Sequence, residues 1–376
     1  MTKAAADDVR STPTVEQAGE VRSAQVESLR ALAALGVLVG HVYGWSHLYG
    51  PEVFQSYVGR ALLGGGFGVS LFFTLSGYLL FLPFARATWG TAPPVALGRY
   101  ALNRALRVLP LYYVVIAFFL VVQGEELRPA WWRFALLLES FWSDSVAQVD
   151  GPVWSLLLEV QFYALLPLLA LGLARGSGGS LGRAAVLLLA LGSIGLVVRV
   201  ATVNVGHPSE VWRYSLPAWA VFFVPGLLLA LVRVRWDQQR PSWADRGPRS
   251  SPLPWILISM ALLLVVFHDY RLDALLLPAW FVLVGACVLP LRSDRGLRWL
   301  GWRPLSLLGV ASYSLYLWHE PLVRSLRLAS WMPDGLLPLG VTAGVLSIAV
   351  AFLSYHLVEA PFLRLRRQWH GRGPAA

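Results

Sequence analysis

The sequence is poor in charged residues, in lysine and in cysteine. Asp, Glu, Lys and Arg together make up 14% of its 376 residues, whereas about 25% is usual for a soluble domain. Hydrophobic residues account for 56% of the chain. This composition excludes a disordered chain, a coiled coil and nearly every soluble enzyme fold, and it favours a polytopic membrane protein.

Lys3 is the single lysine, and Cys287 is the single cysteine. One cysteine forms no internal disulfide, and it also excludes a cysteine-based zinc site. The net charge of +10 rests on arginine. Because membrane proteins concentrate basic residues in cytoplasmic loops, this charge does not indicate nucleic-acid binding. We find no specific metal-ligand spacing, and we expect neither a metal nor a bound cofactor.

Ten apolar windows are long enough to approach or reach the ~20 residues that cross a bilayer. Both termini are predicted to be cytoplasmic, because 23 of the 31 basic residues then fall on the inner side and eight on the outer side. We therefore expect an all-α, multi-pass helix bundle of the plasma membrane. Trp131–Trp142 is an additional apolar stretch that is either interfacial or re-entrant. The windows lie near 28–46, 61–83, 108–123, 153–173, 184–203, 214–232, 253–268, 274–291, 304–323 and 336–357.

The two ends of the chain are polar or basic and lie outside these windows. Residues 1–26 lack the basic-then-apolar layout of a cleavable signal peptide, and they are predicted to be a flexible cytosolic tail. Residues 27–366 form the expected transmembrane domain, and 367–376 form a basic cytosolic tail. We expect no further domain after the last span.

The first window places a cation and an imidazole on one face of a helix. Arg30 and His41 are eleven residues apart, so their side chains point the same way, about 16 Å apart along the axis. A titratable base deep in the membrane, with a cation at the cytoplasmic entrance, suits a charged donor arriving from the cytosol. Alternatively, His41 only hydrogen bonds to another helix and Arg30 only anchors the span.

Glu159 is an acidic residue inside the fourth window, where an unpaired charge costs several kcal/mol. Ser155 lies one turn earlier and faces the same way. By its depth, Glu159 is predicted to approach His41 and to fix the tautomer of the imidazole. A satisfied polar contact between helices is the competing interpretation.

Other polar groups gather near the ends of the spans. His319 and Glu320 are expected in the outer half of the ninth window, where Pro321 should break or kink the helix; an aromatic interfacial belt also explains this segment. Arg104 and Arg107 form a basic face that either holds phosphates or anchors the third span. The glycine run 64–68, followed by Ser76 and Gly77, favours close helix packing.

Six segments, taken in order, resemble acyltransferase family 3, a family of integral membrane O-acyltransferases. Each apolar segment matches weakly alone, but their order and their ionisable residues are specific. Trp154, Ser155, Tyr316 and Glu359 belong to these motifs, on the acceptor side or in a structural role. The segments are Leu29–His41, Gly68–Tyr78, Asn103–Pro110, Val153–Tyr163, Ser312–Pro321 and Tyr355–Phe362.

The resemblance implies transfer of an acyl group, with acetyl expected, from cytosolic acyl-CoA as co-substrate to a sugar hydroxyl. The acceptor would be a surface polysaccharide, a glycolipid or a glycosylated secondary metabolite. His41 would be the base or acyl relay, with Glu159 tuning it, while Arg30, Arg104 and Arg107 engage the donor. Leu158 stands where many members have a second acidic residue. A transporter or flippase for a lipid-linked sugar is the alternative function.

Overall fold

The computed structural model describes residues 15–47, 54, 56–122, 125–143, 151–205, 209–245, 250–291 and 296–371. Within these residues the regular structure is entirely helical, as expected for an all-α bundle. The α-helices are α1 (Val15–Ser46), α2 (Tyr57–Leu63), α3 (Gly68–Trp89), α4 (Leu97–Val122), α5 (Trp131–Ala135), α6 (Val153–Ser177), α7 (Leu181–Arg199), α8 (Glu210–Arg213), α9 (Leu216–Trp219), α10 (Val224–Gln238), α11 (Leu253–His268), α12 (Leu276–Val288), α13 (Arg303–Val310), α14 (Ser312–Arg327), α15 (Leu336–Ser354) and α16 (Ala360–Gly371).

Eight helical segments of the described residues are long and apolar enough to cross a membrane. In hydrocarbon every backbone polar group needs an internal partner, and helices provide one for nearly all of them. The chain is therefore a multi-pass membrane protein. The segments are Ala24–Ser46, Tyr57–Trp89, Leu97–Val122, Val153–Ser177, Leu181–Val203, Leu216–Gln238, Tyr270–Val288 and Leu336–Arg366.

The other two of the ten predicted windows are also helical but shorter. α11 has 16 residues, and the window 304–323 divides into α13 and α14 at Ala311, whose φ of −87° and ψ of 8° interrupt the helix. Of the predicted break or kink at Pro321, the break is wrong, because α14 continues through Pro321 to Arg327. Proline removes only one backbone donor, and a helix packed among its neighbours tolerates that loss.

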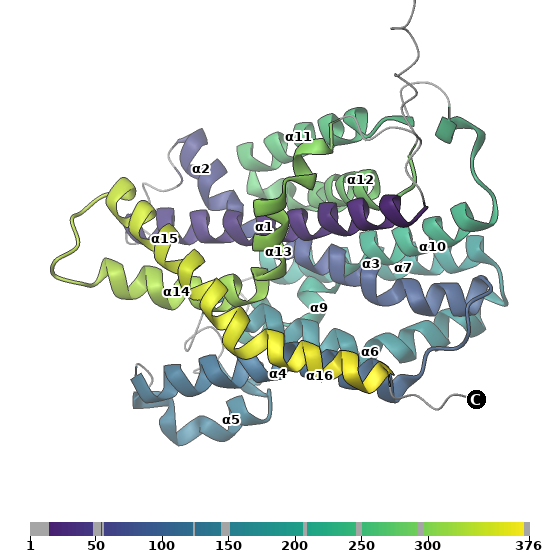
Figure 1. Cartoon of the computed structure of the whole chain (residues 1–376). Helices are drawn as coiled ribbons and strands as arrows, with labels where there is room; N and C mark the ends of the chain where they lie inside the picture. The colour runs from purple at the N-terminus through teal and green to yellow at the C-terminus, as the bar shows by residue number, and fades with distance from the viewer. Residues whose placement is uncertain are drawn as a thin grey trace, which may run out of the picture.

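The helix α1 crosses the middle of the bundle (Figure 1). It packs against α3, α13, α14 and α15. It already begins at Val15, inside the segment expected to be a flexible tail, while residues 1–14 lie outside the described part. At the other end, α15, a π-helical turn (Tyr355–Glu359) and α16 form one continuous helical segment that reaches α4 (Figure 1).

Two close helix contacts depend on glycine. A Cβ atom on Gly65 would lie 2.0 Å from the carbonyl oxygen of Gly36 on α1, and one on Gly77 would lie 2.4 Å from that of Phe223. Both distances are far below van der Waals contact, so only glycine fits. The second contact joins α3 to the start of α10 at the residue that follows Ser76.

Candidate active site

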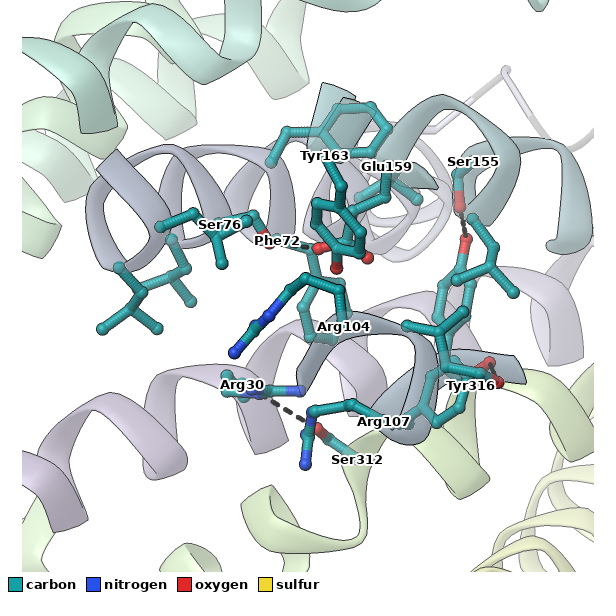
Figure 2. A pocket seen from close by; sticks show the side chains of 18 residues that line it. Arg30, Phe72, Ser76, Arg104, Arg107, Ser155, Glu159, Tyr163, Ser312 and Tyr316 are labelled. Carbon is teal, nitrogen blue, oxygen red and sulfur yellow. Dashed lines mark hydrogen bonds between the residues drawn. The ribbon is translucent and has the colours of Figure 1, made fainter. Parts of the chain in front are cut away.

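A cavity opens between α1, α3, α4, α6 and α14. Most of its wall is apolar, with Phe72 and Leu79 among the lining residues. Seven of the residues predicted from the sequence line it, and they come from all five helices (Figure 2). These are Arg30, Ser76, Arg104, Arg107, Ser155, Glu159 and Tyr316.

Three arginines carry the positive charge of the cavity. The Arg30 Nε atom donates to Ser312 Oγ at 3.3 Å, and it lies 3.8 Å from a carboxylate oxygen of Glu27. Arg104 and Arg107 are three residues apart on α4, and neither forms a hydrogen bond or ion pair with another described residue. Figure 2 shows the three guanidinium groups at one side of the cavity.

Glu159 is the single acidic residue among the described residues that line this cavity. Its Oε1 atom accepts a short hydrogen bond from the Ser76 hydroxyl, and its carboxylate also accepts one from Tyr163. The three arginines outnumber the two nearby carboxylates, Glu159 in the lining and Glu27 beside Arg30, and they leave an excess of positive charge in a largely apolar chamber. Since such surroundings strengthen electrostatic attraction, the cavity is suited to an anion that carries more than one negative charge.

His41 does not line this cavity, and its partner is a histidine rather than Glu159. The His41 Nδ1 atom lies 3.3 Å from Nε2 of His319, and the ring centroids are 4.9 Å apart in an edge-to-face arrangement. The predicted contact between His41 and Glu159 is not formed, because Glu159 is held by Ser76 on α3. The similar depth of two residues in their spans did not fix the direction of either side chain.

Tyr316 connects the histidine pair with the cavity. Its hydroxyl lies 2.6 Å from Ser155 Oγ in the cavity wall. Its carbonyl oxygen lies 2.7 Å from the Nδ1 atom of His319, one turn further along α14. The histidines and the cavity are therefore adjacent parts of one site.

The remaining predicted residues contact other helices. Glu320 accepts a hydrogen bond from Trp45 Nε1 at 3.2 Å, and Glu359 accepts one from Ser314 at 2.6 Å. Trp154 packs in an aromatic cluster against Tyr214 and Trp219, with ring centroids 4.9 and 4.7 Å away. Gly77 lies at the contact between α3 and α10. These four residues are not among those that line the cavity.

Two features of the structure were not predicted from the sequence. Tyr163, one turn after Glu159, lines the cavity, and the helical spacing alone identifies their shared face. Arg199 and Asp273 form a buried ion pair, with two donor nitrogens 2.9 and 2.7 Å from Asp273 Oδ2. Arg199 lies in the 184–203 window, so the cost of a charge in a span also pointed to it.

The Trp131–Trp142 stretch forms α5 and a 3-10 turn, Glu139–Phe141, beside α4. Glu139 is buried and accepts a hydrogen bond from the Tyr112 hydroxyl at 2.8 Å. Burial raises the pKa of Glu139 to about 7, although hydrogen bonds from its own backbone and from Tyr112 act to lower this pKa. A carboxyl group with this pKa changes its charge near neutral pH.

No group of three or more His, Cys, Asp or Glu side chains in the described part of the chain is arranged to hold a metal ion. The absence of a metal and of a bound cofactor stays a prediction.

The fold and the site define a multi-pass membrane protein with a positively charged chamber beside a histidine pair. A family model described as an acyltransferase domain matches residues 23–356. The chain therefore belongs to acyltransferase family 3, as its motifs indicated.

Several curated proteins are similar to the chain. It is 27% identical to "Putative peptidoglycan O-acetyltransferase YrhL" of Bacillus subtilis (strain 168) and 24% identical to "O-acetyltransferase OatA" of Staphylococcus aureus (strain NCTC 8325 / PS 47). Each alignment covers 89% of this chain, and 54% and 56% of the relatives, so the chain spans about half their length. It is 29% identical to "Putative membrane-bound transacylase BcsY" of Komagataeibacter xylinus, covering 94% of this chain and 86% of that protein. No solved structure matches the chain.

Proposed function

We propose that the protein is an O-acyltransferase that moves an acyl group, with acetyl expected, from cytosolic acyl-CoA to a sugar hydroxyl. The acceptor belongs to a surface polysaccharide, a glycolipid or a glycosylated secondary metabolite. The convergence of Arg30, Arg104 and Arg107 on one cavity carries the proposal. Membership of an acyltransferase family and the similarity to the O-acetyltransferase relatives support it.

The arginines suit the phosphate groups of the donor. Guanidinium groups bind phosphate through paired, charge-assisted hydrogen bonds. Arg104 and Arg107 keep their donors available for a ligand, since neither bonds to another described side chain. The flexible arm of CoA separates its phosphates from the thioester, and Arg30 and His41 are separated by about 16 Å along α1. The phosphates would lie among the arginines while the thioester reaches past Tyr316 toward His41.

His41 then acts as the general base. Its Nε2 atom takes the proton of the acceptor hydroxyl as that oxygen attacks the thioester carbonyl carbon. The new C–O ester bond forms, the C–S bond breaks, and the CoA thiolate takes the proton from His41. The donor and the acceptor thus become an O-acyl ester and free CoA, and the imidazole returns to its starting state.

Membrane vesicles that contain the protein provide the test. We expect release of CoA from labelled acetyl-CoA and label in a glycan fraction. His41→Ala should lower the rate by about 10²- to 10⁴-fold, the usual contribution of a general base. His268→Ala changes an exposed histidine at the end of α11 and is the matched control.

Equal membrane levels and equal thermal unfolding of the two variants exclude misfolding as the cause. Normal product formation by His41→Ala would contradict the assignment of the base. Movement of a lipid-linked sugar across the vesicle membrane without CoA release would contradict the enzyme and favour a transporter or flippase.

A further inference from the structure

We propose that His319 is a positioning residue that fixes the tautomer and orientation of His41, so that the Nε2 atom of His41 is the free base. This inference deepens the proposed function and depends on it only for the catalytic use of that atom. The observation that carries it is the pattern of acceptors around the two rings.

The ring of His319 has one consistent protonation pattern. The side chain is fully buried, and its Nδ1 atom lies 2.7 Å from the carbonyl oxygen of Tyr316. A carbonyl oxygen only accepts hydrogen bonds, so Nδ1 must carry a proton. In the neutral ring Nε2 is then the acceptor, and this atom faces His41.

The same reasoning fixes the neighbouring ring. His41 Nδ1 lies 2.9 Å from the carbonyl oxygen of Val37 and 3.3 Å from His319 Nε2. Both of these atoms accept, so Nδ1 of His41 carries the proton and donates to the two of them. If both rings were protonated at Nε2 instead, the unprotonated Nδ1 of His41 would lie 2.9 Å from the Val37 carbonyl oxygen. The unprotonated Nδ1 of His319 would lie 2.7 Å from the Tyr316 carbonyl oxygen. Each such contact is repulsive, and a buried polar group without a partner is costly.

The proton on Nδ1 leaves Nε2 of His41 as the basic nitrogen. In the described residues Nε2 has no hydrogen-bond partner, while Nδ1 has two. When Nε2 takes the proton of the acceptor hydroxyl, the imidazolium still donates from Nδ1 to Val37 and His319. His319 thus orients the base as a carboxylate does in a serine-protease triad, but it does so without a negative charge.

A second contact keeps the two rings together. Trp45 lies one turn after His41 on α1, and its Nε1 atom donates to Glu320, the residue that follows His319 on α14. The helices α1 and α14 are therefore joined at two successive points. This arrangement also accounts for Glu320, whose carboxylate accepts the hydrogen bond from Trp45.

Two substitutions of His319 separate the loss of the acceptor from the loss of volume. His319→Phe fills the site but offers no acceptor, whereas His319→Gln keeps a side-chain oxygen that accepts from Nδ1. We expect His319→Phe to lower kcat for acetyl transfer about 10- to 100-fold, the range that loss of an orienting partner costs a histidine ligand. The KM for acetyl-CoA should stay unchanged, and His319→Gln should recover most of kcat. His47→Phe, which changes a histidine outside the pair and just after the end of α1, is the control.

The tautomer is measured directly by nitrogen NMR of histidine-labelled protein in bilayers, with the His41 signals identified by their loss in His41→Ala. We expect His41 protonated at Nδ1 in the unaltered protein and a second tautomer in His319→Phe. His41 protonated at Nε2 alone, an unchanged tautomer in His319→Phe, or equal kcat losses in the Phe and Gln variants would each overturn the proposal. The NMR result needs no turnover, so it judges this inference even if the protein transfers no acyl group.

Discussion

Arg104 and Arg107 show what residue spacing predicts and what it leaves open. Their separation by three residues predicted one basic face, and both side chains line the cavity. Whether that face binds phosphate or only anchors the helix was open, because both roles use the same residue type near the same interface. The proposed ligand role rests on the position of both guanidinium groups at a chamber that Arg30 also lines (Figure 2).

Removal of the Arg107 guanidinium should weaken donor binding. A hydrogen bond to a charged group contributes about 1.5–3 kcal/mol, so Arg107→Ala should raise the Kd for CoA roughly 10- to 100-fold. Calorimetric titration of CoA into the detergent-solubilised protein measures this change. Arg99→Ala alters an exposed arginine of the same helix outside the cavity lining and should leave the Kd unchanged. Equal Kd values for Arg107→Ala and the unaltered protein would show that Arg107 only anchors α4.

The contact between His41 and His319 could not be predicted from the sequence. His41 and His319 were each identified as ionisable groups in apolar segments, which is a property of composition alone. Their contact joins residues 278 positions apart in the chain, and it depends on how α14 is rotated against α1. The predicted contact between His41 and Glu159 rested on their similar depth in the membrane, and depth along a helix axis carries no information on that rotation.

At the scale of single elements, apolar length predicted the helices well and their interruptions poorly. Most predicted windows contain a helix within a few residues of its bounds. The interruption at Ala311 was missed, whereas a break or kink was expected at Pro321, where α14 is continuous. A break or kink was expected at Pro321 because proline is recognisable in the sequence. The turn at Ala311 has no such signal: it accompanies a contact between Ser312 and Arg30, which are far apart in the chain.

The glycine segments were predicted to serve packing, and Gly77 allows a direct test. A methyl group there would meet the Phe223 carbonyl oxygen at 2.4 Å, and overpacking of this kind costs about 1–3 kcal/mol. Gly77→Ala should therefore lower the Tm by several degrees. Gly172→Ala on α6 is the matched control, because nothing lies within 4 Å of its added Cβ atom.

Thermal unfolding in detergent compares these two variants. An unchanged Tm for Gly77→Ala would mean that α3 and α10 separate without cost. A lower Tm together with an unaltered rate per folded molecule would place Gly77 in packing alone, although it directly follows Ser76, the hydrogen-bond partner of Glu159.

At the scale of the whole molecule, the arrangement of helices gives no direction relative to the membrane. The shape of the bundle is compatible with cytoplasmic or with extracytoplasmic termini. The distribution of basic residues between the loops distinguishes the two orientations. With cytoplasmic termini, 23 basic residues lie inside and eight outside, as the positive-inside rule requires. This orientation matters for the proposed reaction, because it determines from which side the charged donor approaches Arg30.

Cysteine labelling tests the orientation, and the chain is well suited to it because its single cysteine, Cys287, is buried. Glu210 and Gln239 are exposed and lie between different spans. A membrane-impermeant maleimide applied to intact cells should label Glu210→Cys and should spare Gln239→Cys. After the cells are opened both variants should be labelled, while the unaltered protein stays unlabelled. Labelling of Gln239→Cys alone in intact cells would reverse the topology, and the arginine cavity could then no longer receive a cytosolic donor at Arg30.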